Sequence, residues 1–327
     1  MKDSQKKKKP NKKKKNNPPD SIFSYSFVLY IFEILKKNFV WIVISITVIN
    51  LILGIFIVLL IGQIKKTMIT QTLDTMSVPD LPVIAQISDV PLSAEAVIVF
   101  EKDSRSVIMQ KRGSLRFAPA STTKIMTALV VLEHYDTNQY LPAFGVSQIE
   151  GSKMGLVEGE EVKVIDLLYG LMLPSGNDAA HVLASNYPGG KDAFVSKMNK
   201  KAEEFRLYNT HFRDPAGLDD SNYTTAFDLA RLALVALEND ILKKVVETRY
   251  ITVYDRTFVY EHKLENLNKL LDTEGIFGVK TGYTDEAGQV LVTSFESKGK
   301  TYIIVVLKSE DRFSDTEKLT NASGNKC

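Results

Sequence analysis

A serine and a lysine three residues apart are the first pair in this sequence that could carry out covalent chemistry. Ser121 follows Pro119 at the start of a predicted helix, TKIMTALVVLEH, so Lys124 lies on the same helical face. The amine could take the proton of the hydroxyl if the pKa of Lys124 fell from about 10.4 to near 7. Burial, a second cation and a helix N-terminus would each lower it. Because Ser-x-x-Lys occurs elsewhere in the chain, this motif alone also fits a solvated surface pair.

Two further short motifs follow. Ser175-Gly-Asn177 lies between the apolar run DLLYGLML and the helix-like DAAHVLAS, where Ser175 could also be a simple helix cap. Lys280-Thr281-Gly282 occurs once, inside a β-prone run. A glycine weakens a strand unless another backbone must approach closely, and a substrate strand would be such a backbone. The three motifs therefore occupy a helix start, an inter-helix turn and a strand.

The ordered set of three motifs resembles that of the penicillin-recognising serine enzymes. The surrounding stretches narrow the resemblance to the D-alanyl-D-alanine carboxypeptidases among the low-molecular-mass penicillin-binding proteins. These stretches are PASTTKIMTALVVLE, LMLPSGNDAA, HFRDPAGLDDSNYTTAFDLARLA and GVKTGYTDEAGQVLV. The resemblance covers roughly residues 91–320. It implies a peptidoglycan stem peptide as substrate and β-lactam antibiotics as acylating ligands.

The resemblance also implies roles for the catalytic side chains. Ser121 would attack the carbonyl of the penultimate D-Ala, and Lys124 would take its proton. Ser175 would pass a proton to the departing D-Ala amine. Asn177 would orient Lys124 and the substrate amide.

For the substrate-binding side, the resemblance implies that Lys280 and Thr281 hold the terminal carboxylate. Arg312, just before the last predicted helix, would face the same carboxylate. The backbone N–H groups of Ser121 and Tyr283 would form the oxyanion hole, in which a single donor is typically worth ~3–4 kcal/mol. Water would then hydrolyse the acyl-enzyme.

Other classes of protein fit less well. A class A β-lactamase would need an E-x-x-L-N segment downstream of the second motif, and none lies between Asn177 and Lys280. A β-lactam sensor would keep the serine but would need a signalling domain inside the cell, which 38 lysine-rich residues hardly supply. The absence of G-x-S-x-G excludes an α/β-hydrolase, and that of H-E-x-x-H argues against a zinc peptidase. We expect no metal and no cofactor.

The elements that must position these motifs are two strands, a helical region, three strands and a final helix. This order predicts an α+β fold with an antiparallel five-stranded sheet flanked by helices and an inserted helical subdomain. The predicted strands are Ala96–Phe100, Val107–Lys111, Ile276–Tyr283, Gln289–Phe295 and Thr301–Leu307. Thr225-x-x-Asp228 and Ser314-x-x-Glu317 resemble capping boxes that begin helices.

An uncharged apolar run, Phe39–Gly62, precedes this domain and predicts one transmembrane helix about 36 Å long. Residues 1–66 carry 13 Lys+Arg against 3 Asp+Glu, whereas residues 67–327 carry 28 against 36. The positive-inside rule then predicts a cell-membrane protein with a cytoplasmic N-terminus and an extracytoplasmic catalytic domain. The lysine-rich tail would touch anionic lipid of the bilayer, and the acidic body argues against a nucleic-acid partner.

The predicted organisation has five parts. These are a lysine-rich tail (1–38), the transmembrane helix (39–62), a stalk (63–90), the catalytic domain (91–320) and a short tail (321–327). The one cysteine is Cys327, so no intrachain disulfide is possible.

Overall fold

The computed structural model describes residues 21–74 and 90–326. The chain divides into two compact units, residues 1–66 and 67–327. Helix α1 (Ser21–Asp74) is 54 residues long and therefore begins well before the predicted transmembrane segment. Among the residues whose side chains the structure describes, no helix combines the length and apolar character needed to cross a membrane. The first 20 residues of the predicted tail and residues 75–89 of the predicted stalk lie outside the described residues.

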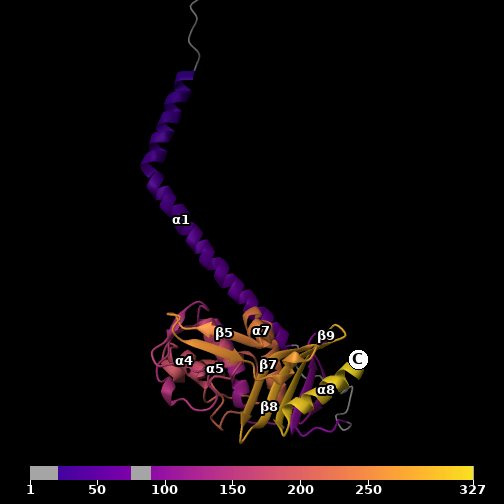
Figure 1. Ribbon diagram of the computed structural model, residues 1–327. Helices are drawn as coiled ribbons and strands as arrows, with labels where there is room; N and C mark the ends of the chain where they lie inside the picture. The colour runs from indigo at the N-terminus through magenta and orange to yellow at the C-terminus, as the bar shows by residue number, and fades with distance from the viewer. Residues whose placement is uncertain (1–20, 75–89, 327) are drawn as a thin grey trace, which may run out of the picture. The chain divides into compact units, whose positions relative to one another are not determined.

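A five-stranded sheet forms the centre of the second unit, and every neighbouring pair of its strands is antiparallel (Figure 1). The strand order is β2-β1-β9-β8-β7, so β7 lies at one edge. This confirms the predicted fold class. The strands are β1 (Ala96–Glu101), β2 (Ser106–Lys111), β7 (Ile276–Thr284), β8 (Gly288–Ser297) and β9 (Lys300–Ser309).

Helices of the inserted region follow β2, and one helix follows β9. They are α2 (Lys124–His134), α3 (Val164–Met172), α4 (Asn177–Ser185), α5 (Gly190–Glu204), α6 (Ala226–Leu237), α7 (Asp240–Glu247) and α8 (Arg312–Lys326). The described residues also include the short 3₁₀ helices η2 (Ala120–Thr123), η3 (Val146–Gln148) and η4 (Lys269–Asp272). Two small hairpins were not predicted: β3 (Tyr140–Pro142) with β4 (Glu161–Lys163), and β5 (Tyr250–Tyr254) with β6 (Glu261–Glu265).

Both faces of the central strands are buried, and alternate residues serve different cores. In β9, Ile303 and Val305 belong to the large core that includes the inserted helices, whereas Ile304 and Val306 pack in a smaller core with Leu319 of α8. This alternation follows from the two-residue period of a strand. The sheet is therefore held between the helical region and α8, and β7 is fixed at its edge.

One predicted helix start is confirmed and the other is wrong. The Thr225 hydroxyl accepts the Asp228 N–H at 3.0 Å and caps α6. Helix α8, however, begins at Arg312, because the Asp311 carboxylate already accepts the N–H groups of Phe313 and Ser314. Asp311, three residues before Ser314, is as good an N-cap as a serine, and the helix begins directly after it. Helix α8 also continues to Lys326, past residue 320 where the catalytic domain was predicted to end.

Candidate active site

Ser121 and Lys124 lie within hydrogen-bonding distance of each other, as their spacing predicts. The Lys124 Nζ donates to the Ser121 Oγ at 2.9 Å. Ser121 belongs to η2 rather than to the first turn of α2, which begins at Lys124. In a 3₁₀ helix residues i and i+3 eclipse, so the tighter turn places the amine over the hydroxyl.

The Lys124 amine is fully buried and is held by two further acceptors. It donates to the Asn177 Oδ1 and to the Ala216 backbone oxygen, each at 2.8 Å. Three acceptors match the three N–H bonds of an ammonium group. Burial lowers the pKa of Lys124 to about 7, although the negative charges of Asp214 and Asp178 oppose this. Lys124 is thus poised to take a proton from Ser121 near neutral pH.

Asp214 organises the loop that supplies one of these acceptors, and the sequence analysis missed it. Its carboxylate accepts four backbone N–H groups and the Asn222 side-chain amide, at 2.7–3.0 Å. These hydrogen bonds outweigh burial and lower the pKa of Asp214. Asp-Pro-x-Gly is a recognisable turn signal, but nothing in it says which carbonyl will face a lysine.

Gly217 brings this loop against the turn that carries the nucleophile. A Cβ at Gly217 would lie 1.9 Å from the Ala120 backbone oxygen, which no side chain could tolerate. The Thr127 hydroxyl also donates to the Pro215 backbone oxygen at 2.6 Å. The loop therefore contacts both η2 and α2, and its position sets the geometry of the serine–lysine pair.

Ser175 lies in the turn between α3 and α4, as predicted, and Asn177 is the first residue of α4. Asn177 is fixed from both sides: its Oδ1 accepts from Lys124, and its Nδ2 donates to the Glu150 backbone oxygen at 2.8 Å. Ser175 adopts a left-handed backbone conformation with φ of 62°. Its buried Oγ has no hydrogen-bond partner among the described residues. A buried hydroxyl without a partner lowers the free energy of unfolding by about 1–3 kcal/mol. A reacting group that hydrogen-bonds to the Ser175 hydroxyl would remove this penalty.

Lys280 and Thr281 are buried in β7. The Lys280 amine has one protein acceptor among the described residues, the Thr281 backbone oxygen at 3.1 Å. Burial, and then the positive charges of Lys124 and Arg312, hold the pKa of Lys280 well below its ordinary value. An anion that approached this buried amine would stabilise its charged form.

Arg312 reaches β7 from the start of α8. Its Nη1 donates to the Gly282 backbone oxygen at 2.8 Å, and its buried Nε has no partner among the described residues. Burial lowers the pKa of Arg312, although Asp311 opposes this. Arg312 and Lys280 together offer unused N–H donors beside the edge strand, which suits a carboxylate.

Comparison with known proteins decides the family. The family model described as D-alanyl-D-alanine carboxypeptidase matches residues 84–311 of this chain. The chain belongs to that family.

Over the aligned residues, relatives in this carboxypeptidase family are about one-third identical to the chain. D-alanyl-D-alanine carboxypeptidase DacF of Bacillus subtilis is 36% identical over 227 residues, which are 67% of this chain and 58% of that protein. The D-alanyl-D-alanine carboxypeptidase of Streptomyces sp. (strain K15) is 37% identical over 238 residues, which are 66% of this chain and 82% of that protein. The crystal structure of the Streptomyces K15 DD-transpeptidase superposes with a TM-score of 0.67 at 34% identity, covering 71% of this chain and 97% of the other.

Gly282 has a different neighbour in this carboxypeptidase-family domain from the one expected. A Cβ there would lie 3.1 Å from both the Ala120 Cβ and the Ser121 backbone nitrogen, and 3.3 Å from the Pro119 oxygen. The backbone that approaches Gly282 is therefore the enzyme's own nucleophile turn. The glycine lets β7 pack against η2, so the strand that carries Lys280 and the turn that carries Ser121 are held together.

Tyr283 lies where β7 meets solvent. Its side chain is 60% exposed, and its hydroxyl donates to the Asp285 Oδ1 at 3.0 Å. This hydrogen bond raises the pKa of the Tyr283 phenol. The side chain thus lies at the rim of the site, and the oxyanion-hole role of its backbone N–H stays a prediction.

Proposed function

We propose that this chain is a serine-type D-alanyl-D-alanine carboxypeptidase that removes the terminal D-alanine from peptidoglycan stem pentapeptides and is acylated by β-lactams. The observation that carries the proposal is the Ser121–Lys124 pair, at 2.9 Å, with a lysine pKa of about 7. A hydroxyl beside a neutral amine is an activated nucleophile. The family match supports the substrate class.

The residues divide the acylation step between them. The Ser121 Oγ attacks the carbonyl carbon of the penultimate D-Ala as its proton passes to the Lys124 Nζ. As the C–N bond breaks, the Ser175 hydroxyl gives a proton to the departing amine and takes up the proton that Lys124 received from Ser121, so both side chains return to their starting states. Asn177 holds Lys124 in place during both proton transfers. Water then cleaves the ester and frees Ser121.

The substrate's terminal carboxylate gives the site its direction. Lys280, Thr281 and Arg312 would bind it along β7, so only the last peptide bond lies over Ser121. A buried amine that gains a carboxylate partner forms a charge-assisted hydrogen bond, which is stronger than a neutral one. We infer that β-lactams enter the same way, because they too carry a carboxylate.

We further propose that Phe39–Gly62 anchors the protein in the cell membrane, with the N-terminus in the cytoplasm and the catalytic domain outside. The uncharged run and the excess of lysine before it support this. Protease added to intact spheroplasts should then digest the catalytic domain. Protection of that domain together with a digestible N-terminus would overturn the orientation.

Incubation with a pentapeptide that ends in D-Ala-D-Ala tests the activity. Mass spectrometry should show the loss of one alanine. One relative, from Pseudomonas aeruginosa, is named a D-alanyl-D-alanine endopeptidase and is 35% identical over 206 residues. The similar Streptomyces K15 structure is named a DD-transpeptidase. A glycine acceptor in the same assay therefore distinguishes hydrolysis from transfer. Rapid turnover of penicillin without release of D-alanine would instead indicate a β-lactamase.

A further inference from the structure

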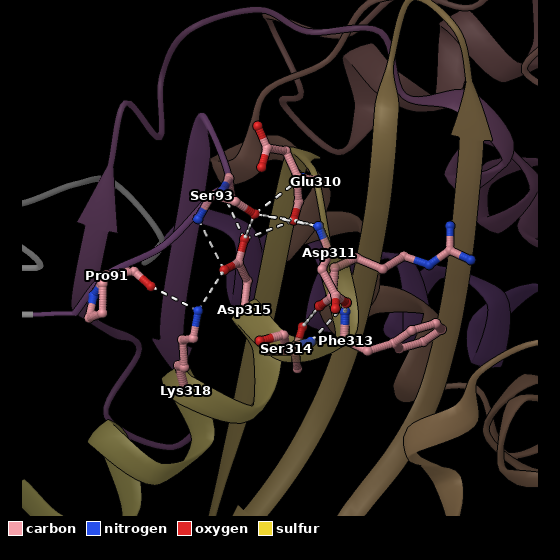
Figure 2. A network of polar contacts seen from close by, with 12 residues as sticks. Pro91, Ser93, Glu310, Asp311, Phe313, Ser314, Asp315 and Lys318 are labelled. Atoms are coloured by element: carbon pink, nitrogen blue, oxygen red, sulfur yellow. Dashed lines mark hydrogen bonds and ion pairs between the residues drawn. The ribbon is translucent and has the colours of Figure 1, made fainter.

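The carboxylate of Asp315, in the first turn of α8, joins segments that lie more than 200 residues apart in the sequence (Figure 2). It is 1% exposed. It accepts the Ser93 N–H at 3.1 Å, the Ser93 hydroxyl at 2.7 Å, the Ala94 N–H at 2.8 Å and the Ser309 hydroxyl at 2.8 Å. These hydrogen bonds outweigh burial and lower the pKa of Asp315. Asp315 therefore ties α8 to the end of β9 and to the segment that leads into β1.

The two hydroxyls that Asp315 orients hold the turn before Arg312. The Ser93 Oγ accepts the Glu310 N–H at 3.1 Å, and the Ser309 Oγ accepts the Asp311 N–H at 3.0 Å. Each hydroxyl donates its proton to Asp315 and accepts with its lone pairs. The carboxylate thus sets the direction of both hydrogen bonds, and through them the position of the turn.

Gln289 of β8 holds the same turn from the other side. Its amide donates to the Glu310 backbone oxygen at 2.5 Å, and its oxygen accepts the Arg312 N–H at 3.3 Å. The backbone from which the Arg312 side chain extends is consequently fixed by side chains of three separate segments. The guanidinium end is fixed in turn by the Gly282 carbonyl.

We propose that Asp315, acting through Ser93 and Ser309, is a positioning residue for Arg312 in carboxylate recognition. The proposal rests on the proposed function, in which Arg312 binds the substrate's carboxylate. It makes the segment by which the chain enters the catalytic domain a structural part of that site. Lys318 reinforces the connection: its Nζ lies 3.6 Å from the Asp315 Oδ1 and donates to the Pro91 backbone oxygen at 3.0 Å.

The test compares acylation by benzylpenicillin with acylation by its methyl ester, which has no carboxylate. In the full chain, Asp315→Asn should slow acylation by the acid about 10-fold and leave acylation by the ester nearly unchanged. The amide cannot accept all four donors, so the turn before Arg312 loses its alignment. Asp255→Asn is the matched control, because Asp255 is a buried carboxylate that accepts turn N–H groups in the β5–β6 hairpin. It should affect the acid and the ester alike.

A double-mutant cycle separates positioning from a general loss of stability. In an Arg312→Ala background, Asp315→Asn should have almost no further effect on acylation by the acid. Full additivity, or an equal loss for acid and ester, would overturn the proposal. Ser93→Ala is a milder variant in case Asp315→Asn does not fold, and it should show the same selectivity at smaller size. Because acylation does not require D-alanine release, the carboxypeptidase activity can fail while this test still gives an answer.

Discussion

The two buried lysines of the site, Lys124 and Lys280, have opposite electrostatic surroundings. Lys124 donates to three oxygens and lies near the negative charges of Asp214 and Asp178. Lys280 has one carbonyl acceptor, and the charges that act on it are the positive ones of Lys124 and Arg312. Burial lowers the pKa of both amines. The charged neighbours of Lys124 raise its pKa again, whereas those of Lys280 lower its pKa further.

The difference teaches how one amine becomes a base and the other a binding group. Lys124 has partners in the free enzyme, so its pKa stays near 7 and its geometry is fixed before the substrate arrives. Lys280 lacks a negative partner, which the substrate would bring. Burial and the positive charges of Lys124 and Arg312 lower the pKa of Lys280, whereas burial lowers the pKa of Lys124. Lys280 therefore contributes little to keeping Lys124 neutral.

Removing the nucleophile should have the largest effect. Ser121→Ala should abolish covalent labelling by fluorescent penicillin, because no other described serine lies beside a lysine with this surrounding. Circular dichroism should show an unchanged fold, since Ser121 contributes no core packing. Ser297 and Ser323 begin two other Ser-x-x-Lys sequences of the chain. Labelling that persists and maps to either of them would show that the nucleophile has been assigned to the wrong pair.

Removing Lys280 should have the next largest effect, and only on ligands with a carboxylate. Lys280→Ala should slow acylation by benzylpenicillin roughly 30-fold or more, as expected for truncating a buried charged hydrogen-bond partner at about 2–5 kcal/mol. Acylation by the methyl ester should fall far less. The acid limb of the pH–rate profile should stay in place; an upward shift would mean that Lys280 is charged in the free enzyme and helps to hold Lys124 neutral.

Replacing Asp214 should lower the pKa of Lys124. Its negative charge raises the pKa of Lys124. Asp214→Asn should therefore move the acid limb downward by about one pH unit. The maximal rate should fall about 10-fold, because the loop that presents the Ala216 carbonyl loses hydrogen bonds. Stopped-flow acylation between pH 5 and 9 measures both. A lower rate with an unmoved limb would leave Asp214 a structural role alone.

The smallest effect on catalysis should come from the buried pair of His262 and Glu160. The His262 Nε2 donates to the Glu160 carboxylate at 3.0 Å, and both side chains are almost fully buried. This hydrogen bond raises the pKa of His262. The stability it adds is fully present below the unfolded pKa of about 6.5 and is lost as the pH rises through the folded value.

His262→Gln should thus lower the free energy of unfolding by about 3 kcal/mol at pH 5.5 and by less at pH 9. Urea unfolding at the two pH values measures the difference. A loss independent of pH would show that the pair contributes packing rather than charge. Acylation at neutral pH should change less than twofold, since His262 does not contact the site.

The sequence predicted the elements whose residues repeat with a clear period or carry a family motif. All five strands of the main sheet lie where the β-prone runs predicted them, and the Ser121–Lys124 contact follows from the spacing of these two residues. The β3–β4 hairpin was missed because its strands have three residues each, and the β5–β6 hairpin was missed because β6 (EHKLE) is mostly polar. Such strands carry little hydrophobic pattern.

Contacts made by backbone atoms could not be predicted from residue types. The Ala216 carbonyl holds Lys124, yet alanine at that position announces nothing. The close approach of Gly282 was foreseen, but its neighbour was not, because only the fold brings η2 against β7. The start of α8 was misplaced because Asp311 and Ser314 are both good caps, and the local sequence does not choose between them.

The pH dependence of wild-type acylation, measured with benzylpenicillin and with its methyl ester, tests the central claim most directly. If buried Lys124 is the base, both ligands should show an acid limb with a midpoint near pH 7. The limb would then belong to the chemical step rather than to carboxylate binding. A limb seen only with the carboxylate-bearing ligand would tie the titration to carboxylate binding and contradict its assignment to the base. The absence of a limb between pH 6 and 8 with either ligand would contradict the assignment of Lys124 as the base.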